Sequence, residues 1–124
     1  MKNLLIFISF FFVQFLFAQE IVPKLDRSSI KIGEPINYEV KVELTDGDKI
    51  IFPTISDTLT YHIEVLGQKL DTIKKDGKAE IIQQLQLTGF DAGKFNIPSL
   101  TILKNGKKLL TKQIEIEIQD IAVD

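Results

Sequence analysis

The sequence predicts an all-β protein in which about seven or eight short strands form an antiparallel sandwich. Three observations predict this fold. Apolar and polar residues alternate with a period of two in several segments, and turn dipeptides that contain glycine separate these segments. No segment shows an unambiguous helical period. Such a pattern is typical of sheets in which each strand buries one face and exposes the other.

The first part of the chain, residues 1–18, has the anatomy of a secretory signal peptide. Lys2 supplies a positive charge, a run of mostly apolar residues follows, and the small residue Ala18 precedes a polar stretch. The apolar run is shorter than a membrane span of about 20 residues, and Gln14 interrupts it. We therefore predict cleavage after Ala18 or one residue later, which leaves a single domain over residues 19–124. A retained N-terminal anchor is the alternative.

The composition of the predicted mature chain limits its function. Removing 18 of the 124 residues leaves 106, enough for one hydrophobic core. The loss of Lys2 lowers the count of Lys and Arg from 15 to 14, against 17 Asp and Glu, so the net charge is −3. Nucleic-acid binding needs a concentrated cationic surface, so this charge argues against it. The absence of Cys excludes disulfides, thiol catalysis, thiolate metal sites and the modified cysteine of a lipoprotein. We expect an exported protein of the periplasm or cell envelope.

A half-buried strand is predicted over Ile36–Leu44, where apolar and polar residues alternate without exception. Gln113–Gln119 repeats this pattern near the C-terminus. The residues predicted to face inward are Ile36, Tyr38, Val40, Val42, Leu44, Phe95, Ile97, Ile114, Ile116 and Ile118. Shorter candidate strands are Ser29–Ile32, Lys49–Phe52, Tyr61–Leu66, Lys69–Ile73, Lys94–Ile97 and Leu100–Leu103.

The segment Ala79–Leu87 is open to two interpretations. It contains good helix formers, and Ile81 and Leu85 are spaced four residues apart, as on one face of a helix. We favour a strand because the same two residues also share a face at period two and the segment follows the turn dipeptide Asp76-Gly77. Asn105-Gly106 is a second dipeptide of this kind, and both favour the tight turns of β-hairpins.

The most specific local motif is Phe90–Pro98. Within it, Asp91 can hydrogen-bond the backbone of a tight corner, Gly93 can supply a positive φ, and Phe95 can fill the core where the next strand begins. Immunoglobulin-type sandwiches carry a similar corner, so the predicted sandwich is immunoglobulin-like. Phe95 lacks the hydroxyl that would bond back to this corner, so only its packing role is expected.

Several segments together resemble the immunoglobulin-like modules of BatD-type proteins, the extracytoplasmic proteins of bacterial aerotolerance (Bat) operons. They are Asp26–Ile30, Gly33–Ile36, Gly93–Pro98, Leu100–Ile102, Asn105–Lys107, Thr111 and Ile114–Ile116. The resemblance implies a non-enzymatic protein that works within a membrane-associated assembly. Because BatD-type proteins usually have further modules and a membrane helix, the chain is expected to be an N-terminal module standing alone or part of a longer protein. The Phe17-Ala18-Gln19 ending of the signal and the Ile- and Lys-rich composition resemble those of Bacteroidetes exported proteins.

Four lysines around the Asn105-Gly106 turn form the candidate contact surface for a partner: Lys104, Lys107, Lys108 and Lys112. A cluster of this kind could dock onto an acidic surface. Lysines at hairpin tips and strand edges also discourage edge-to-edge pairing of sheets, which is the alternative interpretation.

We predict no catalytic, cofactor-binding or metal-binding residues. His62 is the only histidine, and Ser56, Asp57 and His62 lack the spacing of a nucleophile elbow. His62 is therefore expected on the polar face of a strand. Asp46-Gly47-Asp48 is interpreted as a turn, because the further ligands and closing Glu of a calcium-binding loop are missing.

The predicted function is a non-catalytic interaction or scaffold module whose partner is another protein of the cell envelope. The alternative is a sandwich that binds a small ligand, for example a carbohydrate. Carbohydrate sites usually carry exposed aromatic residues, whereas the mature chain has no Trp and only Tyr38 and Tyr61 as tyrosines, and Tyr38 follows the apolar phase of its strand. Membrane association is expected only if the native protein continues beyond Asp124 or retains its signal, and no oligomeric state is predicted.

Overall fold

A computed structural model describes residues 19–121 of the protein. The predicted signal peptide, residues 1–18, lies outside the described residues. The described part contains strands and no helix, and its strands are β1 (Gln19–Ile21), β2 (Lys24–Leu25), β3 (Ser29–Lys31), β4 (Ile36–Leu44), β5 (Ile50–Ile51), β6 (Thr58–Thr60), β7 (Ile63–Lys75), β8 (Lys78–Thr88), β9 (Gly93–Ile97), β10 (Thr101–Lys104), β11 (Lys107–Thr111) and β12 (Ile114–Gln119).

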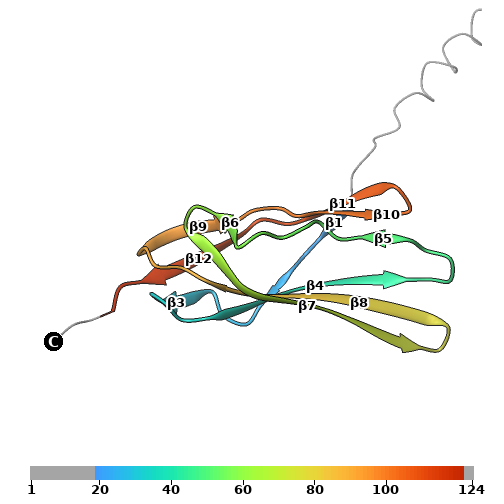
Figure 1. Ribbon diagram of the computed structural model, residues 1–124, viewed down its shortest axis with the longest axis horizontal. Helices are drawn as coiled ribbons and strands as arrows, with labels where there is room; N and C mark the ends of the chain where they lie inside the picture. The colour runs from blue at the N-terminus through green and yellow to red at the C-terminus, as the bar shows by residue number, and fades with distance from the viewer. Residues whose placement is uncertain (1–18, 122–124) are drawn as a thin grey trace, which may run out of the picture.

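The strands form two layers (Figure 1). One layer is a five-stranded sheet with the order β2-β4-β8-β7-β6. The other layer contains the four-stranded sheet β1-β11-β10-β5 and the three-stranded sheet β3-β12-β9. These two sheets follow one another along the layer, because β9 leads into β10 and β11 leads into β12 (Figure 1). The predicted all-β sandwich is confirmed.

The strand count and pairing differ in detail from the prediction. Residues 19–121 contain twelve strands in place of about seven or eight, because each layer includes pieces of only two or three residues and one layer is broken into two sheets. Two pairings, β1 with β11 and β3 with β12, are parallel, whereas the other described pairings are antiparallel. The N-terminal strands therefore lie along the C-terminal strands and join the beginning and end of the domain.

The core lies between the layers and follows the predicted alternation. Eight of the predicted inward-facing residues are buried: Ile36, Tyr38, Val40, Val42, Leu44, Ile97, Ile116 and Ile118. Phe95 and Ile114 are only half-buried. Phe95 lies at the margin of the core beside His62, and Ile114 begins β12 directly after the break between the two sheets. Burial raises the pKa of the Tyr38 phenol, and the nearby Thr111 side chain offsets part of this effect.

The segment with two interpretations is a strand. Ala79–Leu87 lies within β8, and each of its residues is paired with a residue of β4. Leu85 and Leu87 of β8 stand opposite Tyr38 and Ile36 of β4, and all four side chains are buried in the core. Nine cross-strand pairs with a central strand outweigh the helix propensity of this segment.

Both predicted hairpin turns are confirmed. Asp76 and Gly77 have φ values of +52° and +75°, and Asn105 and Gly106 have values of +54° and +78°. Two consecutive residues with positive φ are the mark of a type I′ turn, which suits the twist of a two-residue hairpin. Together with the connection from β4 to β5, both turns lie at one end of the sandwich (Figure 1).

The predicted strand Lys69–Ile73 and residues 63–66 of the predicted strand Tyr61–Leu66 are parts of one strand, β7. Tyr61 and His62 form the turn before β7, so His62 does not lie on a strand as expected. The pairing of β7 with β8 shifts between Val65, which stands opposite Leu87, and Gly67, which stands opposite Gln86. The extra residue, Leu66, is a β-bulge, and a bulge of one residue moves the apolar positions that follow to the opposite phase. The alternation on each side of Leu66 therefore resembles that of a separate strand.

Candidate functional site

Lys104, the first of the four predicted contact lysines, ties the β10–β11 hairpin to the other layer. Its Nζ donates a hydrogen bond to the backbone oxygen of Glu43 at 3.0 Å and lies 3.9 Å from Asp48 Oδ2. The side chain is only partly exposed. Lys104 therefore closes this end of the sandwich. A partner could bind the Lys104 ammonium group only after the contacts with Glu43 and Asp48 were broken.

The tip of the same hairpin is bonded to the turn between β4 and β5. Asn105 Nδ2 donates to Asp48 Oδ1 at 2.8 Å, and Asn105 Oδ1 accepts from the backbone N–H of Lys49 at 2.9 Å. The backbone N–H of Thr45 donates to Asp48 Oδ2 at 2.8 Å. This backbone hydrogen bond, followed by the one from Asn105, holds the pKa of Asp48 below its ordinary value. Asp48 thus serves as an acceptor inside the turn, where Gly47 has a φ of +85°.

The other three predicted contact lysines are exposed but do not share one face. Lys107 stands opposite Lys104 in the β10–β11 ladder, and Lys108 stands opposite Leu103. Neighbouring residues of a strand point to opposite sides of the sheet, so Lys107 and Lys108 diverge. Lys112 follows the far end of β11. The structure brings Lys104 and Lys107 together and separates both from Lys108 and Lys112.

His62 lies beside a carboxylate that the sequence analysis did not pair with it. Its Nδ1 is 3.0 Å from Asp91 Oδ2, and its ring stacks on Phe95 with centroids 4.4 Å apart. Asp91, which was expected to bond the backbone of the corner, thus contacts the turn that precedes β7. No sequence spacing links these residues, which are 29 positions apart. The hydroxyl of Ser56 donates to the backbone oxygen of Thr58, and among residues 19–121 no hydrogen bond joins Ser56 to His62.

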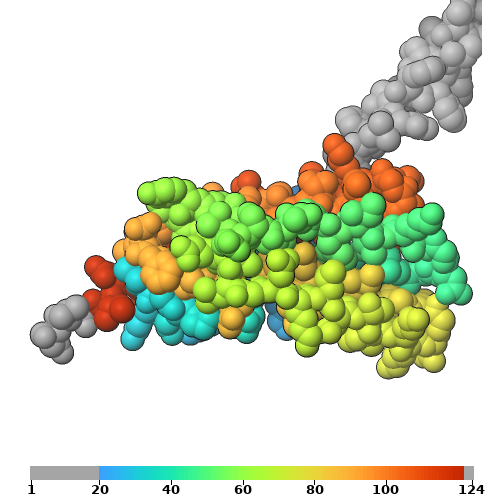
Figure 2. All heavy atoms as spheres, viewed as in Figure 1, coloured from blue at the N-terminus to red at the C-terminus, as the bar shows by residue number. Residues whose placement is uncertain are grey.

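A groove of about 580 Å³ opens between the two layers, and the sequence analysis did not detect it. We call it the β5–β7 groove. One wall comes from β5 and the residues that follow it, the other wall from β7, and the floor from the inner face of β8. Figure 2 shows the face on which the segment from β5 to β6 lies beside β7. The lining residues are Ile50, Ile51, Phe52, Pro53, Gln68, Lys69, Leu70, Thr72, Ile81 and Gln83.

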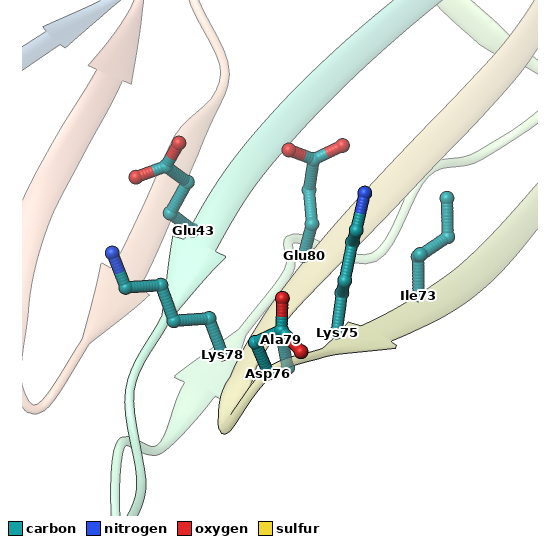
Figure 3. A pocket seen from close by; sticks show the side chains of 7 residues that line it. All are labelled: Glu43, Ile73, Lys75, Asp76, Lys78, Ala79 and Glu80. Carbon is teal, nitrogen blue, oxygen red and sulfur yellow. The ribbon is translucent and has the colours of Figure 1, made fainter.

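A second hollow, of about 460 Å³, lies on the outer face of the β7–β8 hairpin near its tip. Glu43, Glu80, Lys75 and Lys78 all project to the same side there (Figure 3). Glu43 and Glu80 stand directly opposite one another in the β4–β8 ladder. Like charges at such positions repel, and the ammonium groups of Lys75 and Lys78 lie on the same side without forming an ion pair with either carboxylate among the described residues. The hollow therefore carries both signs of charge and favours neither an anionic nor a cationic ligand.

Two further features bear on chemistry. Within the part of the chain that the structure describes, no group of three or more His, Cys, Asp or Glu side chains is arranged to hold a metal ion. Residues 19–121 also include no helix of the length and hydropathy that a membrane span requires.

The match to a known family agrees with this fold. The family description BatD DUF11-like domain matches residues 23–118, from the link between β1 and β2 to β12. The chain belongs to the BatD family. This membership confirms the resemblance predicted from segments such as Gly93–Pro98 and Asn105–Lys107. A search of curated proteins finds no match. The protein is a BatD-like module, and BatD membership associates it with the cell envelope.

Proposed function

We propose that this BatD-family domain is a non-catalytic, exported module that binds another protein of the cell envelope. The observation that carries the proposal is the long unpaired edge of β7. β7 has 13 residues, but β6 pairs only with its first two, Ile63 and Glu64. Among the described residues no strand pairs with the outer edge of Leu66–Lys75.

An unpaired edge of this length is suited to binding a polypeptide. Its free backbone N–H and C=O groups can pair with an added strand, which supplies affinity, while alternate side chains of that strand supply specificity. Lysines on an edge strand keep such sheets from pairing indiscriminately, and Lys69, Lys74 and Lys75 lie on this one. These features favour a selective protein partner over general aggregation.

The non-catalytic part of the proposal is supported by the contacts of the polar residues. Asp48 and Lys104 join the β10–β11 hairpin to the β4–β5 turn, and His62 and Asp91 join the corner to the turn that precedes β7. Each of these groups has a structural role in positioning backbone segments. The alternative function, binding of a small ligand such as a carbohydrate, has weaker support, because Tyr38 is buried and Tyr61 is the tyrosine left on the surface.

The proposal is tested by crosslinking in cells. A photoreactive amino acid is placed singly at Leu70 on the β7 edge, at Lys107 or Lys108 on the hairpin, and at Lys41 on the outer sheet face. We expect at least one of Leu70, Lys107 and Lys108 to capture a specific envelope protein and Lys41 to capture none. If all positions capture nothing while the purified domain binds a defined glycan, the small-ligand function replaces the proposed one.

Export has its own test. The predicted signal peptide implies a mature protein that begins near Gln19, because Ala18 ends a short apolar run. Intact-mass spectrometry of the native protein should therefore give a mass lower by the first 18 residues. A mass that includes Met1–Phe17 would instead indicate an N-terminal anchor.

A further inference from the structure

We propose that the β5–β7 groove binds an extended acidic segment of the partner, which adds to the free edge of β7 and places alternate apolar side chains between the two layers. The inference rests on the proposed function, because it assumes a protein partner. It adds the place of binding, the conformation of the bound segment and its chemical character.

Both walls of the groove end in free strand edges. β5 pairs with β10 on one side only, and among the described residues no strand pairs with its other edge. The Leu66–Lys75 part of β7 likewise has β8 on one side only. The space between these edges, about 580 Å³, lies within the range of about 300–1,000 Å³ found for ligand sites. A strand that enters this space has backbone partners along its length.

The walls of the groove also expose apolar side chains. Ile51 is 62% exposed and Leu70 is 57% exposed, one on each wall. Phe52 and Ile81 lie deeper and are half-buried. Exposed aliphatic side chains that converge on one groove are typical of surfaces that a partner covers. An inserted strand with apolar residues at alternate positions would cover them.

One of the groove-lining residues has an unpaired polar atom. Gln83 lies on the inner face of β8, opposite Val40 of β4 and Leu70 of β7, and is 3% exposed. Its Oε1 is buried and has no hydrogen-bond partner among the described residues. Buried polar side-chain atoms are nearly always hydrogen-bonded in folded proteins. An N–H group of the bound segment would supply the missing donor.

The net charge of the free part of β7 identifies the occupant as acidic. Leu66–Lys75 contains three lysines and one aspartate, so its net charge is +2. Asp71 lies 3.5 Å from Lys69, which leaves Lys74 and Lys75 without an ion-pair partner among the described residues. A second copy of the same chain would place one edge of charge +2 against another, which disfavours self-pairing. A segment with carboxylates beside its apolar residues complements this edge.

The test uses synthetic peptides and the purified protein. The probe is a nine-residue peptide that alternates valine with glutamate or threonine, and binding is followed by NMR of the isotope-labelled protein. We expect the resonances of β5 and of Leu66–Lys75 to shift most. A peptide with lysine in place of glutamate should bind about tenfold more weakly, because two unpaired lysines would lose their partners. A peptide with proline at its centre should not bind, because proline removes a backbone donor.

Two variants separate the groove from the rest of the surface. Gln83→Leu replaces the unpaired amide with an apolar side chain of similar size, and it should weaken peptide binding about fivefold without loss of stability. Gln84→Leu is the matched control: Gln84 is exposed on the opposite face of β8, and this change should leave binding as it is.

The outcomes also separate this inference from the proposed function. Shifts confined to the β10–β11 hairpin, equal binding of acidic and basic peptides, no binding of any peptide, or self-association through Leu70 would each overturn the groove proposal. The proposed function would survive these results if crosslinking from Lys107 or Lys108 still captured an envelope protein. Failure of capture from every position would overturn the proposed function itself.

Discussion

Val42→Asp is expected to unfold the protein, and Lys41→Asp is expected to leave it folded. Val42 is 4% exposed on the inner face of β4, where it stands opposite Ile81 in the middle of the five-stranded sheet. A carboxylate there is buried without a partner, and the apolar contacts of the valine are lost as well. Together these effects cost about 4–5 kcal/mol or more, a large part of the 5–15 kcal/mol by which a typical domain is stable.

Lys41 is the matched control because it is the next residue on the same strand and points to the outer face. Its ammonium group lies 3.5 Å from Glu39, and its side chain is about half-exposed. Loss of such a surface ion pair costs about 0–1 kcal/mol. Urea unfolding followed by circular dichroism measures both variants. Equal stability of the two variants would contradict the assigned register of β4.

Gly89→Ala is expected to lower the free energy of unfolding by about 1–3 kcal/mol. Gly89 is buried after the end of β8, where its backbone oxygen accepts a hydrogen bond from Gly33 at 2.9 Å. A methyl group at this position would collide with Ile118 Cδ1 and would lie 2.9 Å from the backbone oxygen of His62. The side chain of Ile118 can rotate, but the His62 oxygen belongs to the backbone, so the corner as a whole must shift.

Gly67→Ala supplies the control for this prediction. Gly67 is also a strand glycine, but a methyl group there meets no atom within 4 Å. We expect a change within about 0.5 kcal/mol, since surface substitutions away from special contacts have effects of that size. Adding Ile118→Val to Gly89→Ala should recover part of the lost stability, because it removes the colliding Cδ1 atom. Chemical denaturation of these three variants and of Ile118→Val alone measures this coupling, and equal stability of Gly89→Ala and Gly67→Ala would disprove the packing described here.

The parts of the fold that could be predicted have strong local signals. β4 is predicted to the residue, because each position of Ile36–Leu44 indicates its own face. The two hairpins are predicted because Asp76-Gly77 and Asn105-Gly106 readily adopt positive φ at both positions. The β8 segment is harder, since its residues suit helix and strand alike, and its pairing with β4 decides between them.

The parts that could not be predicted depend on contacts between distant segments. β1, β2 and β6 have only two or three residues, too few to show a period, and they exist because neighbouring strands offer them partners. The bulge at Leu66 conceals the continuity of β7 for the reason given above. The predicted lysine cluster is divided because alternation within β11 sends Lys107 and Lys108 to opposite faces.

The candidate groove could not be predicted for the same reason. Ile51 and Leu70 are ordinary strand residues in the sequence, and nothing in their own segments indicates that both edges stay unpaired. Gln83 interrupts the apolar phase of β8 between Ile81 and Leu85, which is the one local signal of an unusual inner face. A buried glutamine at an inward position is a useful indicator of such sites, since its amide needs partners that an apolar core does not supply.

Amide hydrogen exchange along β7 tests the central claim, strand addition to this edge, most directly. Exchange is measured for the protein alone and for its complex with the envelope protein that crosslinking identifies. We expect alternate amides of Leu66–Lys75, those that point away from β8, to exchange more slowly in the complex, because an added strand bonds every second residue. The amides of β11 should be unchanged. Slower exchange in the β10–β11 hairpin, with β7 unaffected, would contradict the claim and place the interface at the lysine-rich turn.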